Sequence, residues 1–414
     1  MKVLWLCNVE FIDENIKTTG GWLQSMAEAL VKSGEVKIVN VTMSAKKDIQ
    51  NEIAGIKQYV VQSSANSVIA PDVLCESIKK IIDIENPDLV HIWGTESLWL
   101  SIATKDFIKK PYLLDIQGLL FSCADFYYGN MRFKDVLNSI HLKEILMPWR
   151  TLWGKQSAFV KRGKGELQGL KKVQYISYQS EWVRNQLTFV NPNAKYYPTR
   201  IMLRKEFIDC KSWAKPNHGD APVVFTTASG AIPYKGIDIA LKAIVELKKF
   251  YPNVKLKIAG QMFIGNRLLD GYSVYLKKMI RKLDVVDNIV FLGPIDANSI
   301  IYELQNADVA INPSFVESYS LAFAESMIVG TPTVCAYSGA MPEFAVDKKE
   351  ALFYNPHDYR QAAAFLKQLI ENDDLAKMIS NNARSRRMKE NAPELVLTTQ
   401  LDIYKKVMED CMAG

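Results

Sequence analysis

Short apolar runs alternate with amphipathic stretches along both halves of the chain. Strands are predicted in the first half at residues 3–7, 36–41, 89–93, 112–116 and 173–177, and in the second half at 223–227, 255–259, 288–292, 309–312 and 333–336. Apolar residues at helical spacing lie between them, as at 73–84, 237–250 and 321–329. Strands that alternate with helices imply βαβ units, and therefore parallel sheets with right-handed crossovers.

This pattern is too long for one hydrophobic core. The 414 residues fit two domains of roughly 150–200 residues each. A stretch rich in proline and turn residues at 197–222 marks the boundary. We therefore expect an α/β protein with two doubly wound domains facing a cleft, at 1–200 and 201–394. A last helix, at about 395–414, could pack back on the first domain.

Composition narrows the class of protein. Charged residues make up 23% of the chain and the net charge is +6, which excludes a disordered chain and does not indicate nucleic-acid binding. The six cysteines lack the spacing of a zinc site or a disulfide framework. The first apolar run is too short for a signal peptide, and no window has the roughly 20 apolar residues of a membrane span. We expect a cytoplasmic protein, at most peripheral at a membrane surface.

The most informative group of polar residues follows the strand predicted at 309–312. Glu317 lies in the loop after this strand, and Glu325 lies eight positions on, in the next helix. Between them come Ser318, Tyr319, Ser320 and Leu321, whose amides begin that helix and can bind an anion. Two carboxylates beside an anion site could hold a polyol joined to a phosphate. Helix capping and a surface position would explain both acids equally well.

The spacing of the two glutamates resembles the E-x7-E signature of retaining family-4 nucleotide-sugar glycosyltransferases. Asn-Pro-Ser before the first Glu and Gly-Thr-Pro after the second are similar to the same family. So are Pro-Tyr-Lys-Gly-Ile-Asp at 233–238, Ile-Ala-Gly at 258–260 and Ser-Gly-Ala-Met-Pro-Glu at 338–343. The likeness covers about residues 223–345 and is thinner in the first half, where Gly20-Gly21 is the main match.

The resemblance implies the GT-B architecture and a set of donor-binding residues. By analogy, Lys235 beside Gly236 contacts the donor diphosphate, Glu325 binds the ribose hydroxyls, and Glu317 contacts sugar and phosphate together with the backbone of 318–321. Gly20 and Gly21 would let the opposite loop approach the phosphates. A plain turn for the glycines and a solvated Lys235 are the simpler alternatives. The chain has no Asp-x-Asp pair, so we expect neither a metal nor another cofactor.

Three positions depart from the family pattern. Gly230 stands where the family usually has an Arg five residues before the Lys, and Arg200, Arg204 or Arg267 could replace that cation. Gln117 stands where many members have a His near the acceptor. Gln can hydrogen-bond a hydroxyl group but cannot act as a base. The Asn-Gly that follows the interdomain strand in the family is also absent.

Other residues allow a functional and a structural interpretation. His91 belongs to the strand predicted at 89–93 and could face the cleft, but it is expected to be structural. The segment 141–172 combines an apolar helical stripe with basic residues, which suits a membrane surface or a lipid-linked acceptor. We favour a helix packed on the N-terminal sheet with a solvated basic face. An aromatic cluster precedes it and suits either an acceptor pocket or a core: Phe121, Phe126, Tyr127 and Tyr128.

Together the motifs and the resemblance predict a glycosyltransferase that moves a sugar from a nucleotide diphosphate donor to a hydroxyl of a glycan or lipid-linked acceptor, and the resemblance implies retention. A nucleotide-sugar epimerase of the same architecture is one alternative, although four histidines are few for its acid–base chemistry. A nicotinamide-dependent oxidoreductase is a second alternative, but the chain lacks the G-x-G-x-x-G that such an enzyme has after an early strand. A catalytically silent sugar-nucleotide-binding protein stays open because of Gly230 and Gln117.

Overall fold

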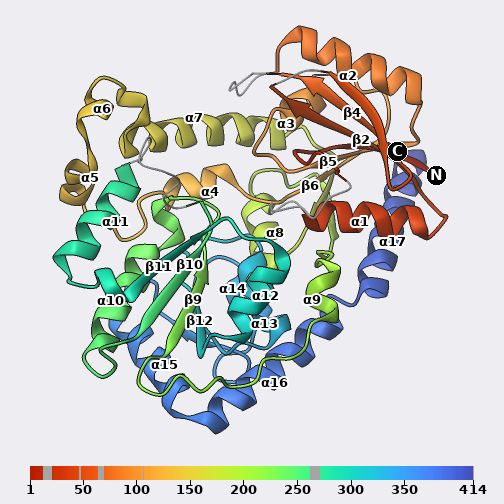
Figure 1. Ribbon diagram of the computed structural model, residues 1–414. Coiled ribbons are helices and arrows are strands. Elements are labelled where there is room, and N and C mark those ends of the chain that lie inside the picture. Colours follow the sequence, from red (N-terminus) through yellow and green to blue (C-terminus); the bar gives the residue numbers. More distant parts are fainter. Residues whose placement is uncertain (13–20, 46–47, 64–69, 106, 262–270, 414) are drawn as a thin grey trace. The chain divides into compact units, whose positions relative to one another are not determined.

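The computed structural model describes residues 1–12, 21–45, 48–63, 70–105, 107–261 and 271–413 (Figure 1). The chain divides into two compact units. Unit 1 comprises Met1–Phe121, Lys161–Arg204 and Glu390–Gly414, and unit 2 comprises Ser122–Val160 and Lys205–Lys389. Each unit contains its own sheet.

The sheet of unit 1 has the strand order β3-β4-β2-β1-β5-β6-β7-β8. Its strands are β1 Lys2–Leu6, β2 Lys37–Ser44, β3 Ile49–Ile53, β4 Ile56–Gln62, β5 Leu89–Trp93, β6 Tyr112–Asp115, β7 Tyr175–Tyr178 and β8 Lys195–Pro198. All pairings are parallel except that of β3 with β4. The central strand β5 is buried along its whole length, as expected for a sheet covered on both faces.

The helices of unit 1 are drawn from distant parts of the sequence. They are α1 Gly21–Lys32, α2 Asp72–Glu85, α3 Trp99–Ala103, α8 Glu181–Thr188 and α17 Pro393–Ala413. The last helix closes the core from the far end of the chain, because the indole N–H of Trp5 in β1 donates to the Tyr404 hydroxyl in α17 at 3.1 Å.

The sheet of unit 2 has the order β11-β10-β9-β12-β13-β14. Its strands are β9 Val223–Thr227, β10 Lys255–Ala259, β11 Ile289–Gly293, β12 Val309–Asn312, β13 Thr333–Ala336 and β14 Leu352–Tyr354. Every pairing is parallel. Counted within the unit, this is the doubly wound order 3-2-1-4-5-6 of a dinucleotide-binding fold.

The helical elements of unit 2 surround this sheet (Figure 1). From the second half of the chain come α9 Lys205–Asp209, η2 Pro233–Lys235, α10 Ile237–Lys248, α11 Gly271–Lys282, η3 Val286–Asn288, α12 Ala297–Gln305, α13 Leu321–Val329, α14 Met341–Phe344, α15 Tyr359–Glu371 and α16 Asp373–Glu390. From the inserted segment Ser122–Val160 come α5 Phe133–Ser139, α6 Leu142–Ile145 and η1 Pro148–Arg150. Among the described residues, three helices cross a unit boundary: α4 Leu120–Asp125, α7 Leu152–Leu170, and α16, whose last residue Glu390 belongs to unit 1.

The fold class predicted from the sequence is confirmed as two doubly wound α/β units with largely parallel sheets. Each of the ten predicted strands overlaps an observed one. The sequence analysis missed β3, β4, β8 and β14, which all lie toward the sheet edges. β3 is mostly polar, β8 and β14 are short, and β4 interrupts its apolar residues with Lys57 and Gln58. The antiparallel β3 at one edge was also unexpected.

The expectation that 141–172 packs on the N-terminal sheet holds only for the last part of the segment, since Lys161–Leu170 belongs to unit 1 and Leu170 is buried in its core. Four members of the predicted apolar stripe, Ile145, Leu146, Trp149 and Trp153, are 63–81% exposed. The stripe assumed one continuous helix, but α6 ends at Ile145 and Pro148 opens the separate turn η1. Residues 122–160 also group with unit 2, although the sequence assigned them to the first domain. Among the described residues, no helix is long and apolar enough to cross a membrane.

Candidate functional site

The sheet of unit 2 has one point at which its winding reverses. Strands β9 and β12 are neighbours, and the chain leaves β9 toward β10 but leaves β12 toward β13. The loops after these two strands therefore diverge, and the carboxyl ends of parallel strands at such a point form a ligand-binding crevice. Lys235 follows β9 and Glu317 follows β12, so the fold brings both predicted residues to this edge.

Lys235 and Glu317 form an ion pair across the divergence. The Lys235 ammonium Nζ lies 2.7 Å from Glu317 Oε1, and the two side chains are 19% and 14% exposed. The same Nζ lies 5.6 Å from the centre of the Tyr234 ring. Burial raises the pKa of Tyr234 well above its usual range, so this neighbour stays neutral. The pair presents one cation and one anion, both partly shielded from water.

Gly236 lets the two loops come this close. It has φ 68° and is the N-cap of α10. A Cβ atom here would lie 2.0 Å from the Pro313 carbonyl oxygen, so only glycine fits both the left-handed backbone and the contact. The Phe315 amide donates to the Tyr234 carbonyl at 2.8 Å, which joins the loops a second time. Lys235 is thus positioned by backbone packing.

Replacing Gly236 by alanine is expected to destabilise the protein by more than the cost of placing alanine in a left-handed backbone conformation. Gly219 is the matched control, because it has φ 58° and a Cβ there would meet nothing within 4 Å. Gly219→Ala should cost about 1–2 kcal/mol from the backbone conformation. Gly236→Ala should cost at least about 2 kcal/mol more, since the Pro313 carbonyl must also move. Chemical denaturation of both variants measures the difference, and equal losses would contradict the close approach.

The backbone of Glu317 is fixed by the loop after β13. Its carbonyl accepts a hydrogen bond from the Ala340 amide at 2.9 Å. Gly339, with φ 52°, lies against the same residue, and a Cβ there would be 2.4 Å from the Glu317 carbonyl oxygen. The Ser338 hydroxyl donates to the Ser314 carbonyl at 2.5 Å. Three loops, after β9, β12 and β13, therefore converge on the Lys235–Glu317 pair.

Helix α13 begins at this convergence. Ser320 is its N-cap, and the Ser320 hydroxyl accepts from the Phe323 amide at 3.3 Å and from the Asn312 side-chain amide at 2.7 Å. The following amides, of Leu321 and Ala322, have no acceptor inside the helix because they belong to its first turn. The helix start thus offers N–H groups and a positive dipole end, which suit an anion.

The loop from Ser318 to Ser320 is buried apart from the Tyr319 ring. Ser318 is 8% and Ser320 is 4% exposed. The Tyr319 ring packs edge-on against Phe344, with ring centres 4.7 Å apart. This contact fixes the loop that leads into α13.

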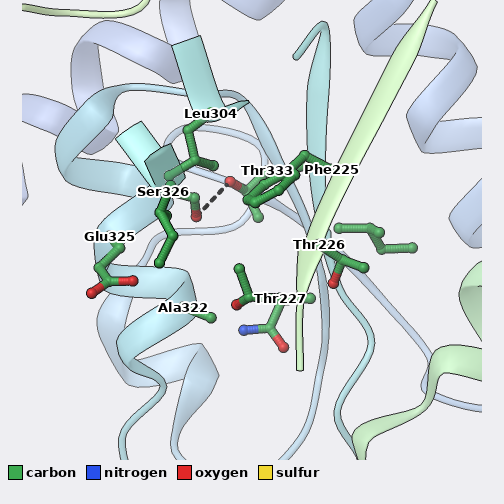
Figure 2. Close-up of a pocket in the computed structure, with 12 residues that line it drawn as sticks. Phe225, Thr226, Thr227, Leu304, Ala322, Glu325, Ser326 and Thr333 are labelled. Carbon is green, nitrogen blue, oxygen red and sulfur yellow. Dashed lines mark hydrogen bonds between the residues drawn. The ribbon is translucent and has the colours of Figure 1, made fainter. Parts of the chain in front are cut away.

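A small pocket lies between β9, β12 and the helices α12 and α13 (Figure 2). Thr226 and Thr227 line it from β9, and Ala322, Glu325 and Ser326 line it from α13 (Figure 2). Glu325 is only 8% exposed and lies at the start of the second turn of α13. Both predicted carboxylates therefore lie in unit 2 near the switch point. Glu317 is in the loop after β12, and Glu325 is in the helix α13 that follows this loop.

The predicted glycines and the replacement cations belong to unit 1 or lie outside the described residues. Gly21 begins α1 in unit 1, where the Arg204 Cδ lies 3.1 Å from the position of a Cβ on Gly21. Arg200, also in unit 1, donates to the Glu390 carbonyl at 3.1 Å. Gly20 and Arg267 lie outside the described residues.

The sequence missed a buried carboxyl group beside Gln117 in unit 1. A Cβ on Gly94 or on Gly118 would lie 2.3 Å or 2.6 Å from the Glu96 carboxylate oxygens, which places Glu96 at the carboxyl ends of β5 and β6. Burial, with the nearby Glu166 carboxylate, raises the pKa of Glu96 to about 7. The only sequence signal was a Gly-Thr-Glu directly after a strand. In the described part of the chain, no three His, Cys, Asp or Glu side chains are grouped as a metal site would need.

His91 is structural, as expected. Its side chain is fully buried, and Nδ1 lies 2.8 Å from the Tyr404 hydroxyl of α17. Burial holds its pKa well below the usual range, so the imidazole is neutral. Tyr127 is likewise a core residue of unit 2, since it is 2% exposed and its ring lies 5.2 Å from that of Phe159 and 6.4 Å from that of Tyr234.

Comparison with known families identifies the region that contains the ion pair. Residues 211–386 match the family model "Glycosyl transferases group 1". This group 1 region includes β9 to β14 and therefore the whole switch point of unit 2. It agrees with the glycosyltransferase resemblance inferred from the motifs.

Curated relatives support the same region. The chain is 28% identical over 179 residues to the uncharacterized glycosyltransferase YqgM of Bacillus subtilis, a match that covers 43% of this chain and 48% of YqgM. The chain spans about half the length of the first curated relatives it matches.

Solved structures share the fold over the whole chain. Sucrose-phosphate synthase from Thermosynechococcus elongatus has a TM-score of 0.77 at 13% identity, with 99% of each chain covered. HepE from Anabaena, in complex with UDP-glucose, has a TM-score of 0.67 at 14% identity, covering 99% of this chain and 100% of HepE. The two-unit fold is therefore that of these GT-B proteins.

Proposed function

We propose that the protein is a glycosyltransferase that moves a sugar from a nucleotide diphosphate-sugar to a hydroxyl group of a glycan or lipid-linked acceptor. The observation that carries this proposal is the Lys235–Glu317 pair, 2.7 Å apart, beside the start of α13 at the switch point of unit 2. The group 1 region and the UDP-glucose complex of HepE support a nucleotide-sugar as donor.

The donor diphosphate would be held by charge and by backbone amides. Lys235 Nζ would exchange part of its contact with Glu317 for a diphosphate oxygen, because both side chains are only partly exposed and an ammonium strongly favours an anion there. The amides of Leu321 and Ala322 would contact the same group. Glu325, buried beside the pocket, would accept hydrogen bonds from the ribose hydroxyls.

The reaction breaks the bond between the anomeric carbon and the leaving diphosphate oxygen. Negative charge grows on that oxygen, and Lys235 with the α13 amides would stabilise it. The acceptor hydroxyl oxygen forms the new bond to the anomeric carbon, and its proton passes to the leaving phosphate. Attack on the face that the phosphate leaves gives retention, and this scheme needs neither a metal nor a protein nucleophile. Glu317 would orient the sugar and keep Lys235 in place.

A donor screen tests the proposal. The purified protein is heated with a panel of nucleotide-sugars, and at least one donor should raise the melting temperature. The same donor should be hydrolysed slowly without acceptor, and the released sugar is measured. A stabilising donor that yields no free sugar and no glycoside would indicate a silent binding protein. Conversion of the donor to its epimer would indicate the alternative enzyme class.

An added cation at position 230 should strengthen donor binding. Gly230 is partly exposed, it has no positive φ, and a Cβ there would meet only Ile232 Cγ1, at 3.9 Å. Gly230→Arg is therefore expected to fold normally. One charged hydrogen bond to the diphosphate would lower the donor Kd by about tenfold. Titration calorimetry measures the change, and Gly230→Gln is the neutral control. An unchanged Kd in both variants would contradict a diphosphate beside this loop.

A further inference from the structure

The inserted segment of unit 2 carries a dense group of exposed apolar side chains. We call it the arm surface, and it spans α5, α6, η1 and the first turn of α7. Its members are Phe133 (71% exposed), Leu137 (47%), Ile140 (36%), Ile145 (64%), Leu146 (81%), Met147 (39%), Trp149 (67%) and Trp153 (63%). Single exposed apolar residues are ordinary, but eight of them within residues 133–153 are a concentration typical of a binding surface.

The segment that carries the arm surface packs against helix α11 of unit 2. Ser139, Leu152 and Glu144 lie 3.1–3.4 Å from the place that a Cβ on Gly271, the first residue of α11, would occupy. Lys278 of α11 donates to the Asn138 carbonyl at 2.6 Å. Figure 1 shows α5 lying beside α11. The apolar side chains therefore project from a packed support.

The turn at 145–150 presents its side chains together. Every residue from Ile145 to Arg150 is exposed. The Arg150 amide donates to the Met147 carbonyl at 2.9 Å, which closes the turn. A Cβ on Gly154 would lie 2.6 Å from the Trp149 Cα, so Trp153 and Trp149 project from adjacent turns of chain.

The exposed charges within the segment that carries the arm surface are of one sign. Among residues 131–153 whose side chains are described, the exposed charged residues are Arg132, Lys134 and Arg150. The two acids there are withdrawn from solvent or engaged: Glu144 is 2% exposed, and Asp135 accepts a hydrogen bond from the Arg132 amide at 3.0 Å. Tryptophan and aliphatic side chains flanked by cations are the composition of surfaces that enter the interface of anionic membranes.

We propose that the arm surface docks on the surface of a lipid bilayer containing anionic lipids. Its apolar side chains enter the boundary between headgroups and acyl chains, and Arg132, Lys134 and Arg150 contact lipid phosphates. A second copy of the chain fits less well, because a symmetric contact would bring together two surfaces that both carry these three cations. The docking is independent of sugar transfer, so it can fail while the proposed function stands.

Vesicle sedimentation tests the docking. The whole chain is mixed with vesicles of phosphatidylcholine alone or of phosphatidylcholine with phosphatidylglycerol. We expect binding to the anionic vesicles, and a loss of at least about tenfold in affinity for Leu146→Ser/Trp149→Ser/Trp153→Ser. The matched control is Val73→Ser/Phe189→Ser/Met412→Ser, since these residues are 76%, 93% and 78% exposed outside the arm. The control should bind like the unaltered protein.

Each of the following results would overturn the proposal. The first is no binding to either vesicle. The second is equal binding of the arm variant and the control. The third is equal binding to neutral and anionic vesicles, which would remove the role assigned to the cations, as would unchanged binding of Lys134→Gln/Arg150→Gln. Sedimentation equilibrium is run on the same samples, and self-association that only the arm variant loses would assign the surface to a second copy instead.

Discussion

Replacing Lys235 by methionine is expected to lower kcat for sugar transfer by about 10²–10³-fold, with a smaller change in the donor KM. The ammonium group would contribute most when charge has accumulated on the departing diphosphate, so its removal should raise the barrier more than it weakens ground-state binding. Methionine keeps most of the aliphatic length of the side chain. Steady-state kinetics with the stabilising donor measures the effect.

The chain supplies a closely matched control for this variant. Lys257 and Glu303 form another ion pair in unit 2, also 2.7 Å long, with side chains 25% and 13% exposed. Lys257→Met leaves a similarly shielded glutamate without its lysine, so the loss of folding stability should be comparable. If Lys257→Met lowered kcat as much as Lys235→Met, the effect would come from stability, and the diphosphate contact would be refuted.

Replacing Glu325 by alanine is expected to weaken donor binding by about 10–100-fold. Two hydroxyl groups of a ribose would each donate to this carboxylate, and hydrogen bonds to a charged group contribute about 1.5–3 kcal/mol. Because Glu325 is 8% exposed, competition from water is weak. The Kd of the donor is measured by titration calorimetry.

The specificity of the Glu325 effect can be checked with truncated ligands. A donor with a deoxyribose should bind the unaltered protein more weakly, and Glu325→Ala should bind both donors alike. Glu303→Ala, on α12, is the control for removing a glutamate from unit 2, and it should leave the donor Kd unchanged. If Glu325→Ala preferred the ribose donor as strongly as the unaltered protein does, the ribose would not contact Glu325.

Much of the fold could be predicted because buried parallel strands are continuous apolar runs. β5, β9, β10, β12 and β13 were predicted with the bounds that the structure shows. Their residues face helices on both sides of the sheet, so the signal is local. β3 has the polar sequence Ile-Gln-Asn-Glu-Ile and is defined by its pairing with β4, which is a contact that periodicity does not report.

The candidate site could be located but not built from the sequence. Glu317 was selected from its place between a strand and a helix start, and Lys235 and Gly236 from a resemblance. The physical reason for Gly236 is its approach to the Pro313 carbonyl, 77 positions along the chain. Glu96 was missed because its burial depends on Gly94, Gly118 and the Glu166 side chain, which three separate segments contribute. Contacts between loops that are distant along the chain produce no motif of fixed spacing in the sequence.

The assignment of Ser122–Val160 to unit 2 affects how the chain can fold during synthesis. These residues emerge from the ribosome before the strands they pack on, and Tyr127 cannot meet Tyr234 until about a hundred further residues have been made. Unit 1 is completed later still, since the hydrogen bond between Trp5 and Tyr404 joins residues 399 positions apart. Neither unit can be completed while the chain grows in order, so nascent protein would expose apolar surface until translation ends, and chaperone holding should matter more here than for tandem domains.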